Sequence, residues 1–451
     1  MMNPHIAKWF EQHAADVTQL SDDMWHHPEV AFEEYYACAQ TAAFMRKNGF
    51  EVREYDASHQ GREPNCVIAT YGAGKPVIGI LGELDALPGL GQEAVPQKAL
   101  LDSHGHGCGH NLLGAGAAAA AAGMAAAMAA EGLAGTVIYY GCPAEETVEG
   151  KVYMAKDGLF DNLDACLSWH PSGGSPRVAE ISMQANTNMD FMFHGITSHA
   201  AGDPWHGRSA LDAAELMSMG VQYLREHVTD DVRIHHAYLS AGLKPNIVPD
   251  YAAVNYYIRA ASRDVDKEVV ERVKDIAKGA ALMTGTTVDW KLNTAVYDTL
   301  VLHSFNRFLH ASASKVPEID YTPEEYDFAN TMFEDHTGAA FKGDDILPAG
   351  LEPLSGTITN VGGSTDVSDV SHIVPTAQIF GPGAVDGLPG HHWTITAPSG
   401  MSIGHKAELY VGRCLAQCGV DLLRQPEAIQ AFWEEFKEAR KDMGPYESPL
   451  K

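Results

Sequence analysis

The stretch HGHGCGHNLLGAG, residues 104–116, places three histidines and a cysteine within seven residues, with glycines between them. Imidazole nitrogens and thiolate sulfurs are ligands that zinc and related ions accept in proteins. Cys108 and His110 stand one residue apart, and the glycines allow the backbone to approach an ion closely. Because no second CxxC or HxxxH pair accompanies them, the pattern favours a catalytic site assembled by the fold over a structural zinc knuckle.

Further potential ligands and acid–base groups occur in four other short stretches. Taken alone, a single histidine is usually structural, and paired glutamates usually form a solvated face. Two of the glutamates, however, follow the apolar stretch VIYYGCPA, so we expect them at the end of a buried strand. Two carboxylates there suggest that one binds a metal and the other acts as general acid and base. The four stretches are Glu83-Leu-Asp85, Glu145-Glu146, His170 and His391-His392.

The elements around these residues read as an α/β sheet. Residues 66–71, 76–87 and 135–146 look like buried strands, and the alanine-rich residues 112–130 form a helix before the last of them. Strands that alternate with helices indicate a sheet with helices on its faces. Ligands gather at the carboxyl ends of such strands, and here those ends carry ELDALPG, CPAEE and SWHPSG.

A second pattern begins near residue 187. Strand-like and helix-like segments follow one another in the order β-α-β-β-α-β, which is the ferredoxin-like split unit. The segments are 186–195, 209–227, 233–242, 252–261, 266–283 and 286–297. We therefore predict an α/β catalytic domain with a mixed, mostly parallel sheet, formed by residues 1–186 and 298–451. A ferredoxin-like lid or dimerisation domain, residues 187–297, is inserted into it.

Bulk properties exclude some classes of partner. A chain of 451 residues fits two domains, and a formal net charge of −28 argues against nucleic acid and anionic membranes. Seven cysteines without tight disulfide spacing, and no signal-like N-terminal segment, predict a cytoplasmic protein. Residues 112–130 are long enough to span a membrane, but alanine and glycine carry little transfer energy. We expect them to form a core helix.

Four motifs, in order and at matching spacing, resemble those of the M20 metallopeptidases, and within them the amidohydrolase branch. HHPEVAFEE resembles the N-terminal helix signature of that branch, and GELDALPG its Asp-Ala-Leu-Pro loop. GHGCGHN is similar to its His-Ala-Cys-Gly-His-Asp block, and CPAEE to its Pro-Ala-Glu-Glu. The resemblance covers nearly the whole chain.

The resemblance implies a site for two divalent metal ions. Cys108 stands where the wider family usually has a bridging carboxylate. The ligand set carried over is Cys108, His110, Glu146, His170 and His391, with His392 left open as the alternative to His391. Glu145 would act as general base toward the metal-activated water, and Asp85 would orient a ligand. Many members have His-x-Asp where this chain has Glu83-Leu-Asp85, so we interpret Glu83 as a supporting or substrate-facing residue rather than a ligand.

The inserted domain also resembles that of the family, whose lid closes over the metals and usually dimerises. GITSHAAGDPWHGRSALDAA is similar to the lid signature, so the resemblance implies that His199 polarises the scissile carbonyl. Asn246 and Arg259 match positions that hold a substrate carboxylate, although either residue could serve packing alone. His194 and His206 are expected to be bystanders.

The function implied is that of a metal-dependent amidohydrolase. Its substrate would be a small N-acyl amino acid or dipeptide-like conjugate with an aromatic acyl group, such as aminobenzoyl-glutamate. The resemblance favours manganese, whereas a thiolate ligand favours zinc. A homodimer through the lid is expected, and a homologous partner subunit is the other possibility.

Two alternative functions stay open. The same site could release ammonia from an aromatic amine, or the chain could be a non-catalytic metal-binding relative. Glu145 and Asp85 argue against the second, because a binding module needs no base. Residues 320–360 have no role that the sequence indicates.

Overall fold

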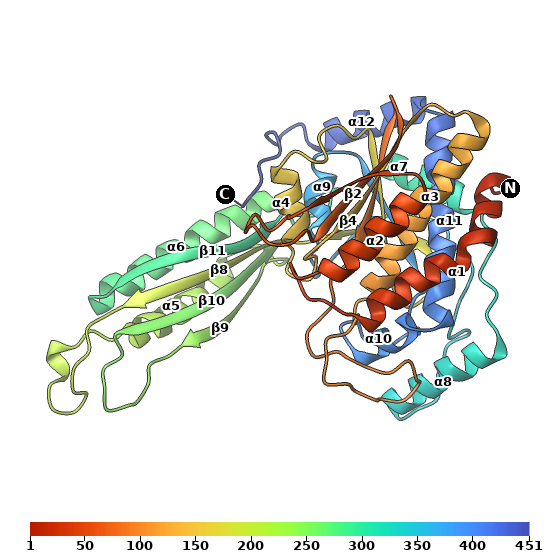
Figure 1. Ribbon diagram of the computed structural model, residues 1–451. Helices are drawn as coiled ribbons and strands as arrows, with labels where there is room; N and C mark the ends of the chain where they lie inside the picture. Colours follow the sequence, from red (N-terminus) through yellow and green to blue (C-terminus); the bar gives the residue numbers. More distant parts are fainter. Residues whose placement is uncertain (451) are drawn as a thin grey trace. The chain divides into compact units, whose positions relative to one another are not determined.

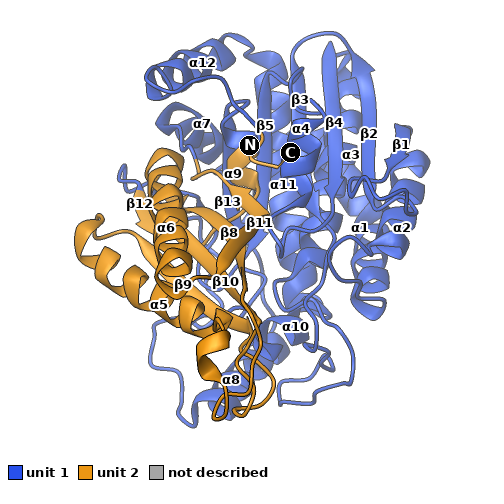
Figure 2. Cartoon of the chain, turned by 90° about the vertical axis from the view of Figure 1, so that its left-hand side faces the viewer, with its two compact units in different colours: residues 1–180, 300–358, 370–447 blue, residues 181–299, 359–369, 448–451 orange. Residues whose placement is uncertain are grey.

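The computed structural model describes residues 1–450, which form two compact units (Figure 2). The first comprises Met1–Glu180, Leu300–Ile358 and Val370–Glu447, and the second comprises Ile181–Thr299, Thr359–Asp369 and the chain end from Ser448. Residues 187–297, predicted as the inserted domain, lie within the second unit. Residues 359–369, predicted as part of the catalytic domain, belong to the second unit, where β12 (Thr359–Val361) pairs in parallel with β7 (Ile181–Met183).

The first unit contains a seven-stranded sheet whose four middle strands are parallel. Its order is β1-β2-β4-β3-β5-β13-β6, and the outer strands β1, β2 and β6 pair antiparallel. The prediction of a mixed, mostly parallel sheet is confirmed. The strands are β1 (Glu51–Tyr55), β2 (Cys66–Ala73), β3 (Val77–Glu83), β4 (Gly135–Cys142), β5 (Ala165–Pro171), β6 (Arg177–Val178) and β13 (Thr376–Gly381).

Helices pack around this sheet, and α1, α3 and α11 also pack against one another (Figure 1). Their buried residues join those of the strands in one apolar core. The helices are α1 (Pro4–His26), α2 (Tyr35–Lys47), α3 (His110–Glu131), α4 (Gly150–Lys156), α7 (His303–Ala313), α8 (Pro323–Thr337), α10 (Trp393–Ser399), α11 (Ser402–Arg424) and α12 (Glu427–Ala439), with a short α9 (Val367–Ser371).

Helix α3 is the alanine-rich segment, and it lies against β3 and α11. By length and composition it could cross a membrane, but 89% of its most apolar window is buried inside the protein. Small residues permit this close packing. A Cβ atom at Gly114 would lie 2.8 Å from the carbonyl oxygen of Glu83, and one at Gly116 would lie 3.1 Å from that of Glu408. The apolar surface of α3 is therefore used for packing in the core.

Residues 320–360 form α8 and an irregular segment. Helix α8 starts at a capping box. The side chain of Thr322 accepts the backbone N–H of Glu325, and the side chain of Glu325 accepts the backbone N–H of Thr322. Its apolar face and the following loop build a small cluster with α10, to which Met332, Leu347 and Trp393 contribute. This segment supports the chain around residue 393.

The second unit has the predicted β-α-β-β-α-β order. Its four strands form an antiparallel sheet of order β11-β8-β10-β9, and α5 and α6 pack against each other and against β8 and β10. The elements are β8 (Ala185–His194), α5 (Ala210–Leu224), β9 (Arg233–Ser240), β10 (Tyr251–Ala260), α6 (Arg263–Thr284) and β11 (Thr287–Val296).

Candidate metal centre

Three neighbouring parallel strands of the first unit bring the predicted site together. β3 ends at Glu83, two residues before Asp85, and β4 ends at Cys142, three residues before Glu145. β5, on the other side of β3, carries His170 near its end. Because parallel strands end at the same edge of a sheet, these side chains converge there.

The glycine-rich turn places Cys108 and His110 over this edge. Gly109 is the residue before α3 and has φ +75°, a left-handed conformation that glycine adopts without strain. Gly105 lies so close to Leu90 that a Cβ atom would be 2.1 Å from its carbonyl oxygen. The turn can therefore fold tightly, and it delivers His110 as the first residue of a rigid, buried helix.

Asp85 organises the centre by holding two predicted ligand residues at once. Its Oδ1 lies 3.0 Å from Nδ1 of His110, and its Oδ2 accepts the backbone N–H of Glu146 at 2.8 Å. A proton on Nδ1 that is donated to Asp85 leaves Nε2 of His110 with its lone pair. Asp85 therefore fixes the orientation of the His110 ring, a contact that supporting carboxylates make in many metal sites.

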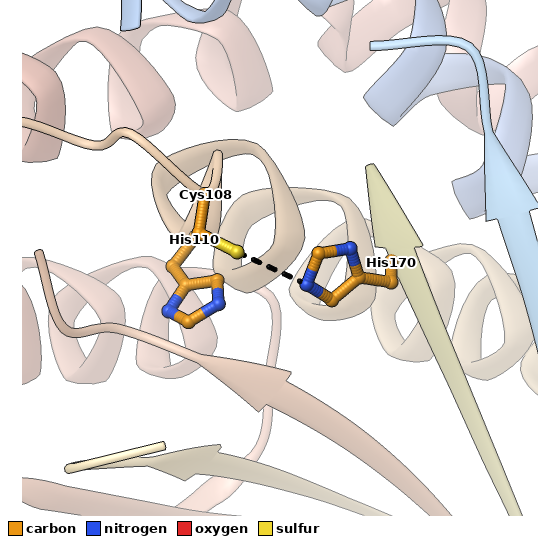
Figure 3. A group of neighbouring side chains, drawn as sticks. All are labelled: Cys108, His110 and His170. Atoms are coloured by element: carbon orange, nitrogen blue, oxygen red, sulfur yellow. Dashed lines mark hydrogen bonds between the residues drawn. The ribbon is translucent and has the colours of Figure 1, made fainter. Parts of the chain in front are cut away.

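Cys108 lies between two sets of potential ligands. Its Sγ is 3.4 Å from Nε2 of His170, and the two side chains point toward one another (Figure 3). The ligand atoms of Cys108, Glu146 and His391 lie within 4.8 Å of one another, and so do those of Cys108, His110 and His170. Cys108 is common to both sets, which is the placement expected of a ligand shared by two ions.

A third set consists of Glu83, His110 and Glu145, again within 4.8 Å. Nε2 of His110 is 3.3 Å from Oε2 of Glu83 and 3.9 Å from Oε2 of Glu145. Within the described chain, three buried atoms of this centre have no hydrogen-bond partner. They are Oε2 of Glu83, Nε2 of His110 and Oε1 of Glu146. Buried acceptors without donors are costly, and divalent cations would satisfy them, so the residues fit a metal centre.

The protonation equilibria also fit bound cations. Burial raises the pKa of Glu146 to about 7, although His110 lowers it in part. Burial, together with the charge of Glu146, raises the pKa of Cys108 to about 12. Burial lowers the pKa of His170 to about 4, and His110 adds to this effect. Positive ions would favour the thiolate, the carboxylates and the neutral imidazoles, which are the forms that bind metals.

The two adjacent late histidines are separated by the structure. Nε2 of His391 lies 3.3 Å from Oε2 of Glu146. His392 turns to Thr394, 3.0 Å from its Nδ1, and stacks edge-on with His336. His391 has φ +51°, a left-handed conformation that is strained for a histidine. The geometry therefore favours His391 as the ligand.

The remaining predicted residues belong to the second unit. His199 is exposed, and its Nδ1 accepts the backbone N–H groups of Ala201 and Gly202 at 3.2 and 2.9 Å. Its proton is therefore on Nε2. The carbonyl of Asn246 accepts the N–H of Ala200 at 3.1 Å, so His199 and Asn246 lie on adjacent segments.

Arg259 does not join these two residues. It lies near the end of β10, and its guanidinium donates to Ser364 Oγ at 2.9 Å and to the carbonyl of Gly362 at 3.3 Å. His194 pairs with Asp289 at 2.8 Å, and His206 with Asp203 at 2.7 Å. Both histidines make local contacts with a carboxylate at the surface.

Two residues near the centre make contacts that the sequence does not predict. Lys151 of α4 is completely buried, and its Nζ lies 2.7 Å from Oε1 of Glu83. Glu34 is also buried, and its Oε1 accepts the N–H of Ala144 at 2.8 Å. Ala144 has φ +55°, so Glu34 holds the strained turn that presents Glu145. The sequence shows only that Lys151 follows CPAEE by five residues.

Comparison with known proteins agrees with this arrangement. Residues 79–407 match the profile of peptidase family M20/M25/M40. The chain is 36% identical to one subunit of the p-aminobenzoyl-glutamate hydrolase of Escherichia coli, over 96% of this chain and 94% of that one. It is 28% identical to the Xaa-Arg dipeptidase of Mus musculus over 97% and 92%. A dinuclear metal-binding M20 peptidase of Bacillus subtilis has the same fold, with a TM-score of 0.63 and 18% identity over 92% and 99%.

Proposed function

The chain belongs to peptidase family M20/M25/M40, and from this premise we propose that it cleaves the amide bond between an aromatic acyl group and an amino acid. It is a metal-dependent hydrolase of C–N bonds. The observation that carries the proposal is the buried cluster of acceptors around His110 and Cys108, with Glu145 beside it. A binding module would not need a carboxylate at that position.

We propose that Cys108, His110, Glu146, His170 and His391 would hold two divalent ions, since Cys108 belongs to two of the candidate ligand groups. Such ions, when bound, lower the pKa of water and polarise an amide carbonyl. The resemblance favours manganese, and elemental analysis distinguishes it from zinc. The Bacillus subtilis relative is a dinuclear metal-binding peptidase, which supports the number of ions.

The chain's own residues then perform the proton transfers. Glu145 is 8% exposed, so one edge of its carboxylate can be reached by water. It takes a proton from the attacking water and passes it to the leaving nitrogen. Asp85 keeps His110 and the Glu146 backbone in place during this step. His199 donates from Nε2 to the carbonyl oxygen as negative charge develops on it.

The substrate class rests on the relatives and on the second unit. Their names describe an aminobenzoyl-glutamate hydrolase and a dipeptidase, which both cleave an amide next to an amino acid. We propose that Asn246 and Arg259 recognise the carboxylate of that amino acid. The Escherichia coli relative is one of the subunits of its enzyme, which supports a second subunit here, either another copy of this chain or a homologue.

The test combines metal content with product analysis on three proteins: wild type, Cys108→Ala and, as a control, Cys414→Ala. Cys414 is a buried cysteine of α11. Wild type and the control should each contain two manganese or zinc ions and release aminobenzoate from aminobenzoyl-glutamate. Cys108→Ala should lose both properties. Metal without aminobenzoate would reject this substrate, ammonia release would indicate deamination, and wild type without metal would reject the proposed centre.

A further inference from the structure

Glu83 lies buried between two positively charged or metal-binding groups. It is the last residue of β3 and is 1% exposed. Its Oε1 is 2.7 Å from Nζ of Lys151, and its Oε2 is 3.3 Å from Nε2 of His110. Both side chains of the Lys151–Glu83 pair are almost fully removed from solvent. A carboxylate in such a place needs compensation on both oxygens.

The two oxygens of Glu83 are not equivalent. Oε1 accepts a hydrogen bond from the ammonium of Lys151. Oε2 has no hydrogen-bond partner within residues 1–450, and neither has the nitrogen that it faces. Because Nδ1 of His110 is engaged by Asp85, Nε2 is the nitrogen that faces Oε2. A proton or a cation between these two atoms would satisfy both, and with a cation bound Nε2 and Oε2 each offer it a lone pair.

The separation of these two atoms suits a shared ion. Nitrogen and carboxylate ligands lie about 2.0–2.2 Å from a divalent ion, so two neighbouring ligands of one ion are roughly 3.0–3.5 Å apart. The observed distance from Oε2 to Nε2 is 3.3 Å. Glu83 is fixed at the end of β3, and its Oε1 is held by the fully buried Lys151. Its side chain therefore has little freedom to change rotamer, and Oε2 stays at this position.

We propose that Oε2 of Glu83 is a ligand of the ion bound by Nε2 of His110, and that Lys151 is the positioning residue for Glu83. This inference rests on the proposed metal centre and adds a carboxylate to its ligand set. It replaces the interpretation of Glu83 as a supporting or substrate-facing residue. A further carboxylate also makes that position better suited to manganese than to zinc.

The variants remove the carboxylate of Glu83, and the double variant does so without leaving the buried charge of Lys151. Glu83→Gln keeps an acceptor toward Lys151, and the double variant Glu83→Gln/Lys151→Met removes both charges of the pair. Glu325→Gln is the matched control, because Glu325 is also buried in the first unit and pairs with Lys406 at 2.7 Å, outside the centre. Thermal unfolding should show which variants remain folded.

Each purified full-length protein is stripped with a chelator and titrated with Mn²⁺ by calorimetry, with elemental analysis of the reloaded protein. Wild type and Glu325→Gln should bind two ions. The double variant should lose one ion, or bind it at least about tenfold more weakly, and the same variant should gain preference for Zn²⁺ in a competition. If it does not fold, Glu83→Asp, which withdraws the carboxylate by one methylene, should show the weaker binding.

The outcomes separate this inference from the proposed function. A folded double variant that binds two Mn²⁺ with wild-type affinity would overturn the role of Glu83 and leave the metal centre intact. A purely structural ion pair predicts that result. Wild type that binds no divalent ion would reject the metal centre itself, and the role of Glu83 with it.

Discussion

At the scale of single residues, the centre depends on carboxylates that have different tasks despite their proximity. Glu145 and Glu146 are adjacent, yet the backbone N–H of Glu146 is bound by Asp85 and its side chain faces His391, whereas Glu145 faces His110. These contacts support the proposal that Glu146 binds a metal and Glu145 moves a proton.

Substitution of each glutamate by glutamine should distinguish proton transfer from metal binding. Glu145→Gln should reduce kcat by about 10²–10⁴-fold, because the general base is lost, while two ions remain bound. Glu146→Gln should lose metal as well as activity. The measurements are kcat on an aminobenzoyl conjugate and metal content of the same preparations. Loss of metal from Glu145→Gln would show that Glu145 is a ligand and not the base.

Residue types and spacing were sufficient to find the main side chains of this site. Cys108 and His110 form a recognisable pair, and Glu145-Glu146 ends an apolar strand. Lys151 could not be found in this way, because a single charged residue is interpreted as a surface position unless its burial is known. Glu34 lies in the HHPEVAFEE motif, but the motif does not show that its side chain binds the backbone of Ala144. Nor could the choice between His391 and His392 be made, since it depends on the left-handed backbone at 391.

At the scale of elements, the centre requires close contact between α3 and β3. His110 begins α3 and Glu83 ends β3, so any change in the distance between these elements moves two groups of the site. Gly114, one turn into α3, allows this contact, because a Cβ atom would lie 2.8 Å from both the Glu83 carbonyl oxygen and Leu84 Cδ2.

Gly114→Ala should therefore destabilise the first unit although alanine is the better helix former. Overpacking of this kind costs about 1–3 kcal/mol, which exceeds the gain of about 1 kcal/mol in helix propensity. Gly279→Ala is the matched control. Gly279 lies in α6 with no atom within 4 Å of an added Cβ, so that variant should be more stable. Denaturant unfolding measures the free energy of unfolding of both variants. A change of the same sign in Gly114→Ala and Gly279→Ala would refute the packing argument.

The N-terminal turn of α6 contains a buried carboxyl group with consequences for pH. Burial raises the pKa of Asp266 to about 6, although Arg263 lowers it in part. Oδ2 of Asp266 accepts the Thr187 hydroxyl at 2.6 Å, which joins α6 to β8. The folded state retains this proton at a pH at which the unfolded chain has released it.

The second unit should therefore lose stability as pH rises from about 4 to about 6, and the effect of this group should be constant above that range. The total change is about 3 kcal/mol, from a pKa of about 6 against about 3.9 in the unfolded chain. Asp266→Asn should lack this slope. Hydrogen exchange of the β8 and α6 amides, measured across this pH range, reports the stability of the second unit. The same pH dependence in wild type and in Asp266→Asn would show that Asp266 is not its source.

The order of elements in both units followed from hydrophobic pattern, because alternating strands and amphipathic helices are local signals. The membership of 359–369 did not. Three residues of β12 are too short for a periodic pattern, and their pairing with β7 joins segments that are far apart in the chain. The role of residues 320–360 could not be predicted either. The residues of the α8 capping box can be seen in the sequence, but the packing of α8 in one cluster with Trp393 cannot.

At the scale of the whole molecule, the second unit presents an apolar surface that we expect to be covered by a second copy. One face of α5 exposes Leu216, Met219 and Tyr223, the last with 72% of its surface accessible. β9 is an edge strand of the sheet and exposes Leu239 (Figure 1). The Ser218 hydroxyl of α5 lies 3.1 Å from that of Tyr238 on β9, so the helix lies against this edge strand.

An edge strand beside an apolar stripe is a surface that soluble proteins normally cover. With a formal net charge of −28, two copies repel each other, so apolar contacts must hold a dimer. We therefore expect wild type to sediment as a dimer whose association becomes tighter as salt is added, because salt screens the repulsion. Tyr223→Glu should weaken the dimer at least tenfold. Leu282→Glu, an equally exposed site on α6, should not, and a monomeric wild type or equal effects of both variants would reject this interface.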